Sequence, residues 1–179
     1  LSAKLDGLDF KTYVLMGDAE IAEGQIWEAA EISAHYKLNN LIGIVDVNRL
    51  GQSTENIDDH NLEKISKKFS AFGWQVYTVN GHEVKELVEV FDEITNIKNK
   101  PIMILAKTYK GYGIKEVQDK LGYHGKPFAK EELGKILDEL KSNFKKDAEF
   151  QEAGAWEPEK PTLSTSGGSR SKTQDEITI

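Results

Sequence analysis

The chain has 179 residues, of which 39% are hydrophobic and 30% are charged, a balance typical of a globular domain. Its net charge of −7 argues against nucleic acid as a partner, because an acidic surface repels a phosphate backbone. Cysteine is absent, which excludes disulfides, zinc–thiolate sites and a cysteine nucleophile, and the apolar runs are too short to span a membrane.

The predicted elements alternate between helices and strands. Residues 1–7 are typical of the last turns of a helix that ends at a glycine, and not of a natural start, so we expect further sequence before them. Apolar runs predict four strands, and helical periodicity predicts helices between and after them; the strands are 13–16, 41–47, 74–79 and 101–106, and the helices 26–34, 62–72, 84–91 and 133–144. This order indicates an α/β fold, a three-layer parallel sheet with helices on both faces, incomplete at its N-terminus.

The domain is predicted to comprise residues 1–146. Beyond them the apolar pattern stops, and residues 164–169 have linker composition, so we expect 147–179 to be a disordered linker or tail. Inside the domain, the glycine-rich segment 107–127 is too long to be an ordinary connection, which indicates a functional or mobile loop.

Two predicted strand ends carry polar residues that suit a phosphate and a cation. Gly17 and Asp18 follow the first strand, and Asn48 follows the second. Ligands of open α/β sheets bind beyond the carboxyl ends of the strands, helix N-termini attract anions, and carboxylate and amide oxygens suit Mg²⁺. Each residue alone is also common in a turn, but the two together, if their strands are neighbours, predict a metal-bridged diphosphate site.

Two further candidates lie in the glycine-rich loop. Lys110 and His124 could face the same ligand edge, although a loop hydrogen bond or a surface charge would also explain them. The other histidines are interpreted as structural or solvent-facing: His35, His60 and His82. Glu23 is expected in the first turn of a helix, where the helix dipole alone would favour a carboxylate.

These motifs resemble a known enzyme class. The run Gly17-Asp18-Ala19-Glu20 with Asn48 resembles the thiamine-diphosphate motif, which transketolases, deoxyxylulose-phosphate synthases, 2-oxoacid dehydrogenases and decarboxylases share. The stretches that narrow the resemblance to animal-type transketolases and their bacterial relatives are 48–53, 71–74, 80–82, 106–111 and 124–127. We therefore identify the chain as similar to the diphosphate-binding domain of transketolase.

The resemblance implies a role for each matching residue. Asp18, the Asn48 side chain and the Leu50 carbonyl would hold Mg²⁺, or Ca²⁺ or Mn²⁺, on the diphosphate. The backbone at three motif positions would cradle the phosphates: Gly17, Ala19 and Glu20. The family usually has glycine where Ala19 stands, and a methyl group there costs little if φ is negative but strains the backbone if φ is positive.

The remaining implied roles concern the cofactor ring and the substrate. Gln52 would lie near the thiazolium or aminopyrimidine. Lys110 and His124 would face the diphosphate and the reacting sugar, with His124 a catalytic partner in proton transfer or oxyanion binding. Glu23 would belong to a catalytic carboxylate network across a dimer interface.

For the whole protein, the resemblance implies a cytoplasmic homodimeric transketolase. Such an enzyme transfers a two-carbon glycolaldehyde unit from a ketose phosphate to an aldose phosphate, and a pyrimidine-binding domain or partner subunit completes its site. The 179 residues alone are therefore expected to be inactive. Two alternatives stay open: a deoxyxylulose-phosphate synthase-like enzyme that starts from pyruvate, and a non-catalytic cofactor-binding or scaffold module.

Overall fold

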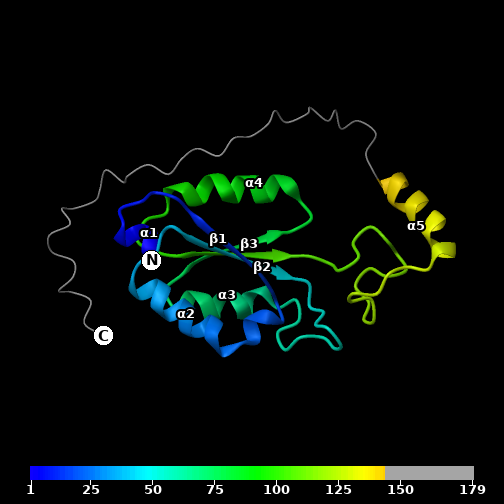
Figure 1. Ribbon diagram of the computed structural model, residues 1–179, viewed down its shortest axis with the longest axis horizontal. Coiled ribbons are helices and arrows are strands. Elements are labelled where there is room, and N and C mark those ends of the chain that lie inside the picture. The colour runs from blue at the N-terminus through cyan, green and yellow to red at the C-terminus, as the bar shows by residue number, and fades with distance from the viewer. Residues whose placement is uncertain (144–179) are drawn as a thin grey trace.

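The computed structural model describes residues 1–143. Within them, four strands form one parallel sheet in the order β1-β2-β4-β3 (Figure 1). The strands are β1 (Thr12–Gly17), β2 (Leu41–Val47), β3 (Gln75–Asn80) and β4 (Ile102–Lys107). The four apolar runs of the sequence predict these strands to within one residue at each end, so the α/β prediction is confirmed.

The helices cover both faces of the sheet, as expected for three layers. The helices of the described residues are α1 (Ser2–Leu5), η1 (Glu20–Ala22), α2 (Gly24–His35), α3 (Leu62–Ala71), α4 (Val84–Glu93), η2 (Ile94–Asn96) and α5 (Lys130–Asn143), and those that cover the sheet are α2, α3 and α4. The steps from β1 to β2 and from β2 to β3 run the same way across the sheet, whereas the step from β3 to β4 runs back. Because such crossovers are right-handed, α2 and α3 lie on one face and α4 on the other (Figure 1).

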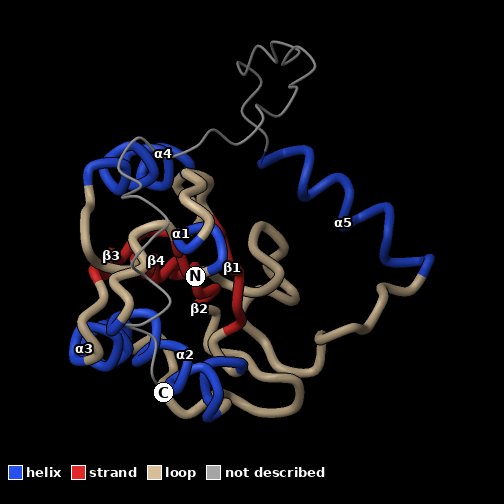
Figure 2. The backbone as a smooth tube through the Cα atoms, turned by 60° about the vertical axis from the view of Figure 1, so that its left-hand side comes forward, coloured by secondary structure: helices blue, strands red, loops and turns tan. Residues whose placement is uncertain are grey.

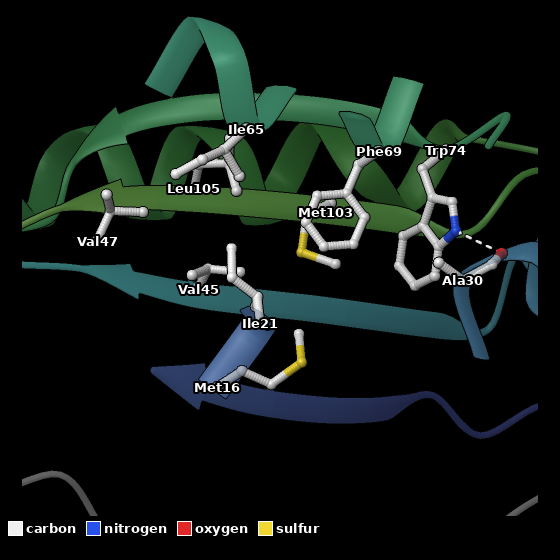
Figure 3. Packing of buried hydrophobic residues seen from close by; sticks show 10 residues of the cluster. All are labelled: Met16, Ile21, Ala30, Val45, Val47, Ile65, Phe69, Trp74, Met103 and Leu105. Atoms are coloured by element: carbon white, nitrogen blue, oxygen red, sulfur yellow. Dashed lines mark hydrogen bonds between the residues drawn. The ribbon is translucent and has the colours of Figure 1, made fainter. Parts of the chain in front are cut away.

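The core on the α2–α3 side contains aromatic residues packed against the sheet. Phe69 of α3 is fully buried, with its ring centroid 4.8 Å from that of Trp27 and 5.8 Å from that of Trp74. The Trp74 Nε1–H donates to the carbonyl oxygen of Ala30 at 2.9 Å, which joins α2 to the start of β3 (Figure 3). This contact satisfies the one polar atom of the indole inside an apolar cluster.

The opposite face buries a second cluster beneath α4. Ile42, Ile102 and Ile104 are almost completely buried there, and Leu87 and Phe91 of α4 pack against them. Strand β4 is therefore enclosed on both faces, as its uninterrupted apolar sequence predicts.

Strand β1 lies at the edge of the sheet and pairs only with β2 within the described residues. Tyr13, Val14 and Leu15 are exposed, Leu15 by 72%. The apolar run of β1 therefore does not indicate a buried strand in this chain. Among residues 1–143, we find no helix that is both long and apolar enough to cross a membrane.

Helix α5 lies apart from the sheet, past the carboxyl ends of the strands (Figures 1 and 2). Its apolar side packs on the 107–127 segment, where Ile136 forms a buried cluster with Ile114 and Val117. The Asn143 side-chain amide donates to the Gly113 carbonyl at 2.9 Å. The predicted domain boundary at 146 and the predicted linker, 147–179, lie outside the described residues.

Candidate functional site

The two polar strand ends meet at the carboxyl edge of the sheet. Strands β1 and β2 are hydrogen-bonded neighbours with Gly17 opposite Asp46, and the Asp18 N–H donates to the Asp46 carbonyl at 3.2 Å. The backbone N–H of Arg49 donates to a carboxylate oxygen of Asp18. Asp18 and Asn48 are each only 7% exposed. The structure therefore brings together the two residues that the sequence placed at neighbouring strand ends.

The amide of Asn48 has a fixed orientation. Its Nδ2 donates to Oδ2 of Asp46 at 2.9 Å, and its Oδ1 accepts from the Leu50 N–H at 3.1 Å. The other carboxylate oxygen of Asp46 accepts from the Thr108 hydroxyl. Because Asp46 binds the amide nitrogen of Asn48, the amide oxygen is fixed in position, and its second lone pair, beside the one that accepts from Leu50, suits a cation.

Asp46 and Thr108 are site residues that the sequence reasoning missed. The one available signal was a carboxylate at position 46 inside an apolar strand. Such a side chain is costly to bury unless it has partners. Its partner Thr108 is 62 positions away, so only the sheet order reveals the contact.

The electrostatics of the site favour a bound cation. Burial raises the pKa of Asp18 above its ordinary value, and the negative charge of Asp46 raises it further. The backbone N–H groups of Arg49 and Ala19 and the nearby amide of Asn56 lower this pKa in part. A divalent cation would offset the repulsion between the two carboxylates and stabilise the ionised form of Asp18.

The residues present fit a metal-bound diphosphate. Within residues 1–143, no cluster of three or more His, Cys, Asp or Glu side chains could hold a metal alone. A mixed set of carboxylate, amide and carbonyl oxygens is however what Mg²⁺ accepts, with phosphate oxygens completing its shell. Apart from the two residues bonded to Gly17, no atom of the described residues lies within 4 Å of where a Cβ on Gly17 would stand, so there is room for a ligand at that strand end.

The structure of the turn after β1 gives the backbone conformation of Ala19 and corrects the expected position of Glu23. Ala19 has φ −71° and ψ −30°, so its methyl group causes no backbone strain. Glu23 is the exposed N-cap residue of α2, which begins at Gly24; our placement of Glu23 in the first helical turn is therefore wrong. The carboxylate of Glu20 accepts from the Gly17 N–H at 3.0 Å, so an anionic oxygen already lies against this backbone.

Within residues 1–143, no hydrogen bond joins Lys110, His124 or Gln52 to Asp18 or Asn48. Lys110 Nζ lies 3.0 Å from His124 Nδ1, within hydrogen-bonding distance, so these two residues form a pair. Lys110 is half-buried and His124 is exposed. Gln52 is exposed in the loop that follows β2.

Two histidines anchor the start of the 107–127 segment. His82 Nε2 accepts from the Tyr109 N–H at 2.8 Å, and its ring stacks on that of Tyr112 with centroids 3.7 Å apart. His60 Nε2 lies 2.9 Å from the Thr108 carbonyl oxygen. Both therefore hold the loop by hydrogen bonds rather than pointing at a ligand.

The contact of His82 predicts a pH-dependent stability. Burial lowers the pKa of His82 below its ordinary value of 6.5, although Asp46 opposes the shift. Below about pH 6.5, His82 therefore binds more protons in the unfolded chain than in the folded one. Its contribution to the unfolding free energy is fully present above that pH and falls as the pH decreases. We expect wild type to lose more unfolding free energy between pH 7.5 and 5.5 than His82→Gln, measured by urea denaturation. Equal losses in the two proteins would contradict this role.

Comparison with known proteins identifies the family. Residues 3–154 match the family described as "Transketolase, thiamine diphosphate binding domain". The chain belongs to this transketolase family. The resemblance inferred from the motifs is thereby confirmed.

Individual transketolase relatives agree with this assignment. The chain is 43% identical to transketolase-like protein 2 of Bos taurus over 141 residues, and 42% identical to transketolase of Homo sapiens over 139 residues. These matches cover 79% and 78% of this chain and 22% of each relative. The chain thus spans about a fifth of the length of these transketolases.

Solved transketolase structures share the fold. The crystal structure of transketolase from Campylobacter jejuni subsp. jejuni NCTC 11168 matches with a TM-score of 0.65 and 28% identity, covering 78% of this chain and 22% of that one. Transketolase from Leishmania mexicana matches with a TM-score of 0.63 and 30% identity, covering 74% and 20%. The α/β architecture is therefore that of transketolases.

Proposed function

We propose that this chain is the diphosphate-binding part of a transketolase that transfers a two-carbon glycolaldehyde unit from a ketose phosphate to an aldose phosphate. The observation that carries the proposal is the meeting of Asp18 and Asn48, buried and oriented, at the adjoining ends of β1 and β2 in a chain of the transketolase family. Thiamine diphosphate, when bound, supplies the carbon centre that accepts and returns the two-carbon unit.

The proposed metal site uses oxygen ligands only. Asp18, the Asn48 amide oxygen and the Leu50 carbonyl would hold Mg²⁺, with Ca²⁺ or Mn²⁺ as substitutes. The burial that raises the pKa of Asp18 supports this assignment, because a dication favours the ionised carboxylate. Asp46 would act through Asn48 by holding its amide in the metal-facing orientation.

The proposed roles of the other residues follow their positions. Gly17, Ala19 and Glu20 would line the phosphate cradle with their backbone, which requires the Glu20 carboxylate to leave the Gly17 N–H. Lys110 and His124 would face the diphosphate and the sugar as a pair, with His124 as the proton-transfer or oxyanion residue. Gln52 would approach the cofactor ring, and the exposed Glu23 would join the carboxylate network of a dimer.

The proposed active form is a cytoplasmic homodimer that includes a pyrimidine-binding domain, in the same polypeptide or in a partner subunit. We refer to this chain together with that domain as the assembled protein. Because the chain spans only about a fifth of its relatives, we expect the isolated 179 residues to be inactive. Detectable transfer by the isolated chain, with thiamine diphosphate and Mg²⁺, would contradict that expectation.

The decisive test is coupled turnover of xylulose 5-phosphate with ribose 5-phosphate by the assembled protein. We expect cofactor-dependent transfer that is lost in Asp18→Ala, since the variant keeps the fold but removes the metal carboxylate. Release of carbon dioxide from pyruvate instead would indicate synthase-like chemistry. A folded, cofactor-bound protein with neither reaction would indicate a non-catalytic binding module and overturn the proposal.

A further inference from the structure

Arg49 occupies a strained position in residues 48–56 after β2, which we call the metal loop because they contain the proposed ligands Asn48 and Leu50. It lies between Asn48 and Leu50 with φ +62°, a conformation that costs free energy for a long side chain and persists only where surrounding contacts hold it. Its N–H donates to the carboxylate of Asp18. The backbone of Arg49 therefore contacts one proposed metal ligand, Asp18, and is covalently linked to the other two, Asn48 and Leu50.

The side chain of Arg49 reaches across to the glycine-rich loop. Its Nε donates to Oδ1 of Asp119 at 2.7 Å, and its Nη2 donates to the Asp119 carbonyl at 3.0 Å. Its third donor, Nη1, pairs with Glu55 within its own loop. The guanidinium side chain is only 20% exposed, and this two-point contact on Asp119 has a geometry that a lysine ammonium could not reproduce.

Asp119 links Arg49 to the Lys110–His124 pair by a backbone hydrogen bond to Lys110. It too has a positive φ, +60°, and its N–H donates to the Lys110 carbonyl at 2.9 Å, which closes the turn between positions 110 and 119. Lys110 in turn contacts His124. A continuous series of hydrogen bonds therefore runs from Asp18 through Arg49 and Asp119 to the pair that would face the substrate.

No other hydrogen bond joins residues 48–56 to residues 110–127 in the described part of the chain. The 107–127 segment is otherwise held at its start by His60, by His82 and by the contact of Thr108 with Asp46, and on its far side by α5. Without the Arg49–Asp119 contact, no hydrogen bond within the described residues would hold residues 110–127 against residues 48–56.

We infer that Arg49 and Asp119 form a latch that sets the Lys110–His124 pair at a fixed distance from the proposed metal site. Arg49 is thus a positioning residue that acts through Asp18 on one side and through Asp119 on the other. This role rests on the proposed function, because the latch matters for catalysis only if both loops share one ligand.

The first test measures hydrogen–deuterium exchange of the 179-residue chain without any ligand. Arg49→Lys keeps the positive charge and a long side chain at a position with positive φ, but it loses the two-point contact with Asp119. Asp119→Asn keeps the size of the side chain, and asparagine tolerates the positive φ at this position. We expect amides of residues 110–119, above all that of Asp119, to exchange at least about tenfold faster in both variants. Amides of β2 and β4 should be unchanged, and Glu55→Gln, which removes only the contact within one loop, should resemble wild type.

Combining the variants separates a latch from two unrelated structural roles. If the residues act only through each other, Arg49→Lys/Asp119→Asn exchanges no faster than either single variant, because the effects of coupled residues do not add. Unchanged exchange at residues 110–119 in both single variants would overturn the inference. Additive acceleration in the double variant would overturn it as well.

The second test measures binding of thiamine diphosphate with Mg²⁺ to the assembled protein by calorimetry. We expect Arg49→Lys and Asp119→Asn each to weaken binding at least about tenfold, as loss of supporting contacts around a metal site does, while Glu55→Gln binds normally. Faster loop exchange with unchanged affinity would overturn the positioning role. Failure of wild type to bind the cofactor would instead contradict the proposed function, and the exchange result would still decide whether the latch exists.

Discussion

Replacing Asp18 by asparagine is expected to weaken thiamine diphosphate binding to the assembled protein at least about 100-fold in the presence of Mg²⁺. The substitution preserves shape but removes the carboxylate charge, and Mg²⁺ binds a neutral amide far less strongly than a carboxylate. Loss of a direct ligand should exceed the 10- to 100-fold losses typical of outer contacts. Titration calorimetry of the two proteins measures the difference.

The same substitution should leave the fold intact. Burial and the nearby charge of Asp46 make ionised Asp18 unfavourable without a cation, so losing the charge offsets the loss of a hydrogen bond. We expect the unfolding free energy to change by less than about 1 kcal/mol. Asp59→Asn, at an exposed position of the loop between β2 and α3, is the matched control and should bind cofactor normally. Wild-type affinity in Asp18→Asn would remove this residue from the metal site.

The second large effect concerns the core that supports the site. Phe69→Ala is expected to destabilise the chain by about 3–5 kcal/mol, because it leaves a cavity between Trp27 and Trp74 where the ring is fully buried. Thermal unfolding should therefore begin roughly 10 °C or more below wild type.

A surface substitution on α4 gives the comparison for this prediction. Val88 is 53% exposed, so Val88→Ala should change the unfolding free energy by no more than about 0.5 kcal/mol. Both variants can be measured by urea denaturation monitored through tryptophan fluorescence. A loss below about 1 kcal/mol in Phe69→Ala would mean that the core relaxes around the missing ring.

Much of the fold follows from local sequence pattern. The 41–47 run predicts β2 with its observed bounds, since a parallel strand covered on both faces needs an almost unbroken apolar sequence. The order of the strands does not follow from pattern alone, because β4 inserts between β2 and β3. The position of α5 does not follow from pattern either. Its amphipathic sequence would suit packing on a sheet, yet its apolar side packs on the 107–127 segment.

The apolar sequence of β1 shows where pattern misleads. Its residues are as apolar as those of a core strand, yet Tyr13 and Leu15 are exposed at the sheet edge. Hydrophobicity reports what a side chain would gain from burial, and it does not report whether a neighbour is present.

The candidate site was predictable only where strand ends define it. Asp18 and Asn48 meet because parallel strands place their carboxyl ends at one edge. Thr108 and Asp119 contact residues 62 and 70 positions away, and no local pattern encodes such a pair. Arg49 belongs to the 48–53 stretch that the sequence singles out. Its partner Asp119 cannot be predicted from that stretch, because the contact exists only where the glycine-rich loop folds back onto the metal loop.

The most direct test of the account is titration of the assembled protein with thiamine diphosphate, first with Mg²⁺ present and then with the metal removed by EDTA. The proposed ligands Asp18, Asn48 and Leu50 would hold the diphosphate only through a cation, because the carboxylates of Asp18 and Asp46 would repel a bare anion. We predict tight binding with Mg²⁺, restored after EDTA treatment by excess Ca²⁺ or Mn²⁺, and at least about 100-fold weaker binding without metal. Binding of equal strength with and without metal would contradict the site that we derive from the ends of β1 and β2.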